Sequence, residues 1–255
     1  MNERQFEYPS GCLHYFDSMI SPRGSEVILF LHGWGLATDA YMSSLRLLAQ
    51  DYRVIAPDLP GFGNSCPTTK NYQYDDFASV ILAMIRSLGI SQFHLIGHSM
   101  GGGIGINVAS NHPSMVKSLI LVDSSGIPLG PIWKLVVQRI IELSIQLSAP
   151  SESVLKQKML QSFIRNCIKH YRSMAFSWNM PRTCDLQLLM DKICVPCFIL
   201  WGENDRLTPL THGYLMEQMI SQSKVILVED GYHEWCILRP ERLVAMLLEV
   251  IEPED

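Results

Sequence analysis

The sequence predicts an α/β fold in which a mostly parallel central sheet is flanked by helices and interrupted by a helical insertion. Six short apolar runs have the Val, Ile and Leu content of strands buried on both faces of a parallel sheet: Val27–Leu31, Arg53–Ala56, Phe93–Gly97, Ser118–Val122, Cys197–Trp201 and Val225–Val228. Helical stretches alternate with these runs at Ala40–Gln50, Asp75–Leu88, Met100–His112, Leu210–Ile220 and Pro240–Ile251. This alternation predicts an open sheet with its active groups at the carboxyl ends of the strands.

The chain opens with two short alternating segments, near Gln5–Tyr8 and Leu13–Phe16. They flank Pro9-Ser10-Gly11, which has the composition of a turn. The pattern therefore predicts a β-hairpin ahead of the first parallel strand.

Residues 126–192 break the alternation, because they contain no convincing strand. Two helices are predicted there, Pro131–Ser148 and Ser151–Tyr171. The apolar residues of the first helix spread too widely around it for one buried stripe. This pattern favours a helical cap that covers an apolar cleft. We expect Trp133 and Val137 to contact substrate, while packing of these side chains against the sheet stays an alternative. The predicted domains are a core of residues 1–125 and 193–255 and a cap of residues 126–192.

Composition restricts the class of protein. The chain has 255 residues, 47% of them hydrophobic and 18% charged, and a net charge of −5, which suits one large core without a basic stripe for nucleic acid. No apolar run approaches the ~18 residues of a membrane span. The seven cysteines show no disulfide framework and the N-terminus lacks the layout of a secretory signal, so we expect a cytoplasmic protein. The oligomeric state is left open.

The segment Leu95-Ile96-Gly97-His98-Ser99-Met100-Gly101-Gly102 sets a G-x-S-x-G pattern between a strand and a helix. A serine hydroxyl is a weak nucleophile and needs a neighbouring base, so its Oγ must be held at the tip of a sharp turn. Ser99 is therefore the predicted nucleophile. The amide of Met100, at the start of the helix, is a predicted oxyanion donor.

The predicted base and acid come late in the chain. His233 follows the last predicted strand within Gly231-Tyr232-His233-Glu234, and Asp205 lies in the loop after the preceding strand. The order serine, acid, histidine is the order of hydrolases with a nucleophile elbow. Asp123 and Glu203 remain alternatives for the acid.

The segment His32-Gly33-Trp34-Gly35 directly follows the strand Val27–Leu31. In this topology that loop supplies the second oxyanion donor, and the amide of Trp34 is the candidate. We interpret His32 as a residue that braces the loop by hydrogen bonds.

Together with Asp58-Leu59-Pro60-Gly61-Phe62-Gly63-Asn64-Ser65, these segments resemble those of α/β-hydrolase fold enzymes over essentially the whole chain. The resemblance implies a serine hydrolase, needing neither metal nor organic cofactor, that cleaves small-molecule carboxylic esters with small or medium apolar acyl groups. Two segments are similar to those of methyl esterases that act on pimeloyl carrier protein, but the elbow Gly-His-Ser-Met-Gly differs from theirs. A carbon–carbon bond hydrolase and a ligand receptor with slow turnover are the alternatives.

Overall fold

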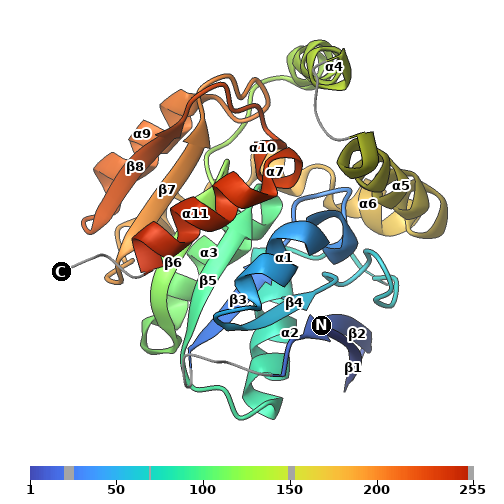
Figure 1. Cartoon of the computed structure of the whole chain (residues 1–255), viewed down its shortest axis with the longest axis vertical. Coiled ribbons are helices and arrows are strands. Elements are labelled where there is room, and N and C mark those ends of the chain that lie inside the picture. The colour runs from blue at the N-terminus through green and yellow to red at the C-terminus, as the bar shows by residue number, and fades with distance from the viewer. Residues whose placement is uncertain (20–25, 69, 149–152, 252–255) are drawn as a thin grey trace.

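The computed structural model describes residues 1–19, 26–68, 70–148 and 153–251. Its centre is an eight-stranded sheet with the order β1-β2-β4-β3-β5-β6-β7-β8 (Figure 1). The strands are β1 (Asn2–Tyr8), β2 (Gly11–Asp17), β3 (Val27–Leu31), β4 (Arg53–Pro57), β5 (Phe93–His98), β6 (Val116–Val122), β7 (Cys197–Gly202) and β8 (Ser223–Val228). Strand β2 pairs antiparallel with β1 and β4, and all the other pairs are parallel. The predicted mostly parallel sheet and its opening hairpin are confirmed.

The central strands β3, β5 and β6 are buried on both faces, as their apolar runs predicted. The prediction is wrong for Val225–Val228, because β8 lies at the edge of the sheet and is partly exposed. All five residues of β3 are buried, and they alternate between two cores. Leu29 and Leu31 join the core beneath one set of helices, whereas Ile28 and Phe30 join the core on the opposite face. A strand with water on one face would not need this continuous apolar run.

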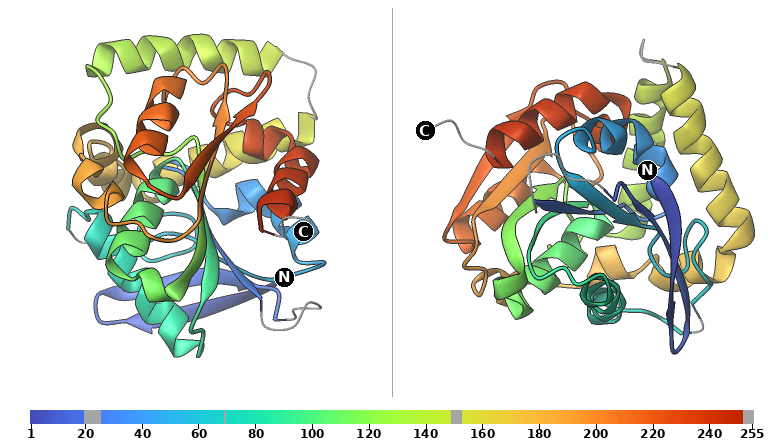
Figure 2. Two further views of the ribbon diagram at one scale, coloured as in Figure 1. Left: turned by 90° about the vertical axis from the view of Figure 1, so that its left-hand side faces the viewer. Right: turned by 60° about the horizontal axis from the view of Figure 1, so that its bottom comes forward.

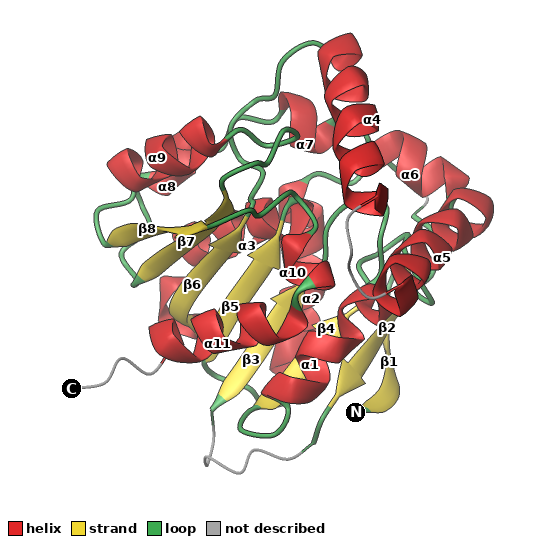
Figure 3. Cartoon of the chain, turned by 45° about the horizontal axis from the view of Figure 1, so that its top comes forward, coloured by secondary structure: helices red, strands yellow, loops and turns green. Residues whose placement is uncertain are grey.

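Helices cover both faces of the sheet (Figure 3). One face carries α2 (Tyr74–Ser87), α3 (Met100–Asn111), α8 (Gln187–Met190) and α9 (Leu210–Met219). The other carries α1 (Met42–Leu48), α10 (Trp235–Leu238) and α11 (Pro240–Ile251). The predicted helix at Ala40–Gln50 divides into a 3-10 turn, Thr38–Tyr41, and α1, and a second 3-10 turn, Pro113–Met115, precedes β6.

The insertion lies between β6 and β7. It contains α4 (Ile132–Ser148), α5 (Ser153–Lys169), α6 (Tyr171–Ser177), α7 (Met180–Thr183) and α8, and its described residues form no strand. Helices α4 and α5 lie beyond the carboxyl ends of the strands (Figures 2 and 3). Helix α8 instead contacts α3 and α9 beside the sheet. The division into a core and a cap at residues 126 and 192 stays a prediction.

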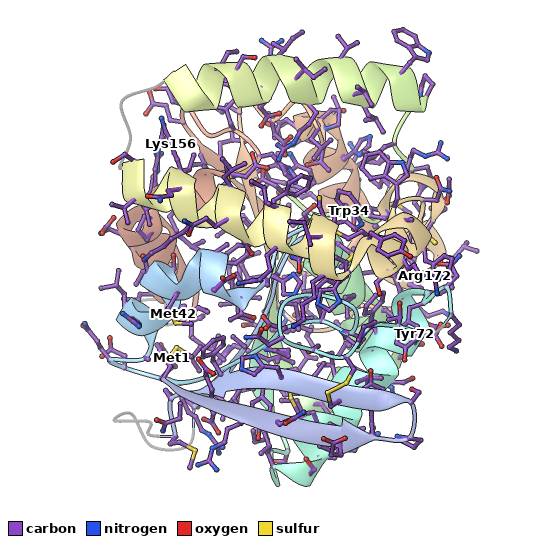
Figure 4. The ribbon with its side chains drawn as sticks, turned by 90° about the vertical axis from the view of Figure 1, so that its right-hand side faces the viewer. Met1, Trp34, Met42, Tyr72, Lys156 and Arg172 are labelled. Carbon is purple, nitrogen blue, oxygen red and sulfur yellow. A yellow bond between two sulfur atoms is a disulfide. The ribbon has the colours of Figure 1, made fainter. Side chains whose placement is uncertain are left out.

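Cys12 and Cys66 form a disulfide, visible as the bond between two sulfur atoms in Figure 4. The expectation that the cysteines form no disulfide is wrong at this pair. The two residues are 54 positions apart in sequence, but the Cys66 N–H donates to the Cys12 carbonyl at 2.9 Å, which brings their Cα atoms within 5.2 Å. This proximity depends on the pairing of β2 with β4, which the cysteine spacing does not reveal.

Across the described ranges, no helix is both long enough and apolar enough to traverse a bilayer. The cytoplasmic location stays a prediction.

Candidate active site

Ser99 occupies the sharp turn between β5, which ends at His98, and α3, which begins at Met100. Its backbone has φ +51° and ψ −116°, a conformation that a non-glycine residue adopts at a cost of about 1–3 kcal/mol. Gly97 and Gly101 make the turn possible. A Cβ on Gly97 would collide with the backbone of Gly101, and a Cβ on Gly101 would collide with the carbonyl oxygen of Leu31.

The structure brings the predicted nucleophile, base and acid into one hydrogen-bonded chain. His233 Nε2 lies 3.1 Å from Ser99 Oγ, and His233 Nδ1 lies 2.8 Å from Asp205 Oδ2. All three side chains are buried. They meet because Ser99, Asp205 and His233 follow the carboxyl ends of the parallel strands β5, β7 and β8.

Hydrogen bonds from its own loop fix the Asp205 carboxylate. The N–H groups of Leu207 and Thr208 both donate to Oδ1 at 2.8 Å, and the Thr208 hydroxyl donates to Oδ2 at 2.5 Å. The same Oδ2 also lies within hydrogen-bond distance of the His233 imidazole. The loop thus presents a preorganised acceptor to the ring.

The electrostatic surroundings of His233 favour its charged form. Burial alone would lower the pKa of the imidazole, but the charge and hydrogen bond of Asp205, with the charges of Glu234 and Asp123, raise that pKa to about 9. A buried cation next to a carboxylate is what a reaction that transfers a proton to His233 requires.

Neither alternative acid bonds to His233. The carboxyl of Asp123 accepts the Gly202 N–H at 2.8 Å and the indole N–H of Trp235 at 2.6 Å, so its acceptors serve the fold. Complete burial raises the pKa of Asp123 well above its usual range. Glu203 is exposed to solvent.

The two predicted oxyanion donors flank Ser99. A Cβ built on Gly33 would lie 3.3 Å from Ser99 Cβ, which places the loop carrying Trp34 directly beside the elbow. Within the described residues, neither the amide of Trp34 nor that of Met100 donates a hydrogen bond. The Trp34 indole N–H donates to Ser177 Oγ at 3.1 Å and anchors the loop under the cap (Figure 4).

His32 braces this loop, as interpreted from the sequence. Its Nδ1 donates to the Gly33 carbonyl at 2.9 Å, and its Nε2 accepts the Leu59 N–H at 2.9 Å. Burial lowers the pKa of His32, so the ring is neutral and can accept at one nitrogen while it donates at the other.

His98 is a second buried histidine whose positioning role the sequence did not reveal. Its Nε2 donates to the His233 carbonyl at 3.0 Å, and its Nδ1 accepts the Tyr41 hydroxyl at 2.6 Å. The same hydroxyl accepts the Gly33 N–H at 3.2 Å. Burial lowers the pKa of His98 to about 3, so a neutral ring connects the loop of the base to the loop of Trp34.

A cavity of about 400 Å³ opens beside Ser99 between the core and the cap. Its walls are mostly apolar, and they include Leu36, Leu129, Leu135, Ile140, Leu160 and Phe163. Trp133 and Val137 are not part of the lining, and both side chains are exposed. At about 100° per residue, Leu135, Val136, Arg139 and Ile140 form the face of α4 toward the cavity. The predicted helix contributes to the cavity, but through other residues than those expected.

Glu142 and Arg139 of α4 reach the loops of the acid and base, which sequence reasoning missed. Glu142 Oε1 accepts the His233 N–H at 2.6 Å, and its Oε2 accepts the Arg206 N–H at 3.2 Å. Arg139 forms an ion pair with the buried carboxylate of Glu234. The sequence contains a signal for this role, because Arg139 and Glu142 are the only charged residues within the mostly apolar stretch 135–145.

In the part of the chain that the structure describes, no three His, Cys, Asp or Glu side chains are grouped as metal ligands. The predicted nucleophile, base and acid lie together with two amides that donate no hydrogen bond among the described residues, and acyl transfer requires groups of these kinds.

Comparison with known proteins defines the class. The family model for the alpha/beta hydrolase fold matches residues 26–144. A solved structure of a bacterial membrane phospholipase A superposes with a TM-score of 0.82 at 23% identity, covering 98% of this chain and 85% of that one. This chain therefore has the α/β-hydrolase fold, and the predicted fold is confirmed.

Two curated relatives are similar at the sequence level. The dihydrolipoyllysine-residue acetyltransferase component of the acetoin cleaving system of Pseudomonas putida is 28% identical over 224 residues, which are 79% of this chain. This chain spans only 57% of that relative's length. Monoacylglycerol lipase ABHD6 of Bos taurus is 27% identical over 252 residues, covering 88% of this chain and 74% of the lipase.

Proposed function

We propose that the protein is a serine hydrolase that cleaves carboxylic esters with small or medium apolar acyl groups through an acyl-enzyme. The observation that carries the proposal is the hydrogen-bonded chain from Ser99 through His233 to Asp205, which opens into an apolar cavity of about 400 Å³. A similar sequence is that of a monoacylglycerol lipase, which supports an ester as the substrate.

The reaction begins when Ser99 Oγ attacks the ester carbonyl carbon and its proton passes to His233 Nε2, 3.1 Å away. The carbonyl oxygen becomes an alkoxide, which the amides of Trp34 and Met100 stabilise. Loss of one such donor costs about 10²–10³ in turnover in enzymes of this kind.

The tetrahedral intermediate collapses when the bond to the alcohol oxygen breaks and His233 returns the proton to that oxygen. Water then enters, loses its proton to His233 and attacks the acyl carbon, which frees the acid and restores Ser99. Asp205 stays ionised throughout and holds the ring with Nδ1–H directed at its Oδ2.

The cavity supplies the selectivity. The wall formed by Leu135, Ile140 and Phe163 is apolar and fits an acyl chain, because it offers no partner to a buried charge. The charged residues of the lining are Arg139, Arg182 and Glu234, and Arg139 already pairs with Glu234.

The test is turnover of p-nitrophenyl esters from two to twelve acyl carbons by the parent and by Ser99→Ala. We expect kcat/KM to rise with chain length up to the filling of the cavity, and we expect turnover at background level in the folded variant. Failure of every ester, with turnover of a vinylogous diketone, would replace the proposal by carbon–carbon hydrolysis.

A further inference from the structure

Helix α5 buries two polar residues, Ser162 and Asn166, beside the apolar Leu155 and Met159. The face toward the core includes Ser162 and Asn166, both completely buried. Ser162 Oγ donates to Asp39 Oδ1 at 2.9 Å and accepts the Ala37 N–H at 3.1 Å. Asn166 accepts the Gly63 N–H at 2.8 Å and donates to the Gly35 carbonyl at 3.0 Å. Polar contacts therefore fix α5 to the loops of the core.

The outward face of α5 carries three large apolar side chains beside the exposed Gln157 and Gln161. Leu160, Ile164 and Ile168 are 51%, 47% and 76% exposed. At about 100° per residue these three lie roughly half a turn from Ser162 and Asn166. A helix whose outer face meets only water has the opposite arrangement, with its polar residues outside. Three large apolar side chains exposed in a row on α5 therefore indicate contact with an apolar partner.

This apolar face continues over the neighbouring helices. Of the eighteen large apolar side chains exposed in the described ranges, thirteen belong to α4, α5 and α6, and Trp133 is 68% exposed. We call the exposed apolar residues of these three helices the cap surface. Figure 4 looks onto it, with α4 above α5 and with Lys156 and Arg172 near the two ends of α5. Such a concentration marks an interaction site.

Charge indicates what the cap surface binds. Helices α5 and α6 contain five basic residues and no acidic one, whereas the rest of the chain holds 15 basic and 25 acidic residues. Arg165 pairs with Asp39 at 2.7 Å, but Lys158 and Arg172 are exposed. Apolar side chains flanked by basic ones on a helix that lies along a surface suit a bilayer with anionic headgroups.

A second copy of the chain fits this surface less well. A two-fold contact would place the cap surface against its own copy and bring the basic residues of α5 and α6 close to those of the partner. The mouth of the cavity adds a reason for lipid, because Val136, Ile140, Leu160 and Phe163 both line the cavity and are exposed on the cap surface.

We propose that the cap surface of α4, α5 and α6 docks on an anionic lipid bilayer, with the mouth of the cavity turned toward the lipid. Docking is independent of the proposed ester hydrolysis, because binding requires no turnover.

The test is co-sedimentation of the full chain carrying Ser99→Ala with vesicles of phosphatidylcholine, alone or with phosphatidylglycerol. We expect binding to the anionic vesicles that weakens as salt is raised. Ile164→Ser together with Ile168→Ser should lower the partition coefficient about tenfold or more, because both side chains would otherwise enter the acyl region. The matched control is Leu188→Ser with Leu227→Ser, which replaces two exposed leucines outside the cap surface and should bind as the parent does.

Several outcomes would overturn the proposal: no binding to anionic vesicles, equal binding to phosphatidylcholine alone, or equal loss in the control variant. A dimer in sedimentation velocity that Ile164→Ser with Ile168→Ser dissociates would assign the surface to a second copy. Circular dichroism and thermal melting verify that each variant folds. Ile164 and Ile168 do not line the cavity, so hydrolysis of a soluble short ester should be unchanged in that variant on a Ser99 background. Absent hydrolysis in the parent with intact vesicle binding would contradict the proposed function and leave docking standing.

Discussion

Glu142 of α4 accepts the backbone N–H of His233 at 2.6 Å, so a side chain of the cap holds the loop that carries the predicted base. Burial raises the pKa of Glu142 to about 7, although the neighbouring His233 cation lowers it. The attraction is reciprocal, because an ionised Glu142 stabilises the imidazolium and raises the pKa of His233.

The first prediction concerns pH. Only neutral His233 accepts a proton from Ser99, so kcat/KM should rise as pH rises through the pKa of His233, which lies near 9. Glu142→Gln removes a negative charge beside the ring, which destabilises its cation and lowers that pKa. The rising limb of the pH profile should therefore shift to lower pH, most clearly above pH 7 where Glu142 is ionised. The control is Glu249→Gln, which removes a charge at an exposed site far from His233. If the rising limb of the pH profile does not shift in Glu142→Gln, the coupling between Glu142 and His233 is refuted.

The second prediction ranks the acids. Asp205→Asn would place an amide NH₂ at Oδ2 or remove the acceptor of the two loop N–H groups, so the ring would adopt the wrong tautomer and kcat should fall about 10³–10⁴-fold. Exposed Glu203→Gln should change kcat little. Asp123→Asn should mainly lower the melting temperature, because it disturbs the bonds to Gly202 and Trp235. A larger loss of kcat in folded Asp123→Asn than in Asp205→Asn would move the acid to Asp123.

The third prediction concerns the acyl side of the cavity. Ile140→Ser should flatten the rise of kcat/KM with acyl length, because each buried methylene contributes about 0.8 kcal/mol to binding. Val137→Ser, three positions earlier on the same helix but facing solvent, is the matched control and should keep the parental profile. Identical profiles for both variants would exclude α4 from the substrate site.

The fourth prediction concerns the disulfide between Cys12 and Cys66. The denatured, unreduced chain should react with five equivalents of a thiol reagent, since five of its cysteines are free. Reduction should lower the melting temperature by several degrees, because a cross-link across a loop of this length stabilises by roughly 4 kcal/mol in the chain-entropy account. Seven reactive thiols before reduction would show that the bond does not form in the purified protein.

Local patterns made most of the fold predictable. The strand β3 and the elbow around Ser99 each depend on a few consecutive residues, since five buried apolar residues or two glycines beside a serine suffice to define them. The order of Ser99, Asp205 and His233 followed from the same local reading of strand ends. Parallel strands then place these ends at one edge of the sheet.

Features that depend on tertiary contacts could not be read in this way. Helix α4 is apolar nearly all round, so its sequence does not fix which side faces the cavity. The bonds from Glu142 to the backbones of Arg206 and His233 belong to the packed arrangement that sets this rotation. Trp133 and Val137 were expected at the cavity because of their composition, and the rotation turns them outward. The partnership of Cys12 with Cys66 likewise depends on the order of strands in the sheet.

The central claim is that Ser99 becomes acylated with His233 as its base. Intact-mass spectrometry of the parent after a brief reaction with a p-nitrophenyl ester, followed by peptide mapping, tests it most directly. We expect a mass increase of one acyl group located on Ser99, which is absent in Ser99→Ala and forms far more slowly in His233→Ala. Hydrolysis without any acyl adduct on Ser99, or an adduct of equal rate in folded His233→Ala, would contradict it.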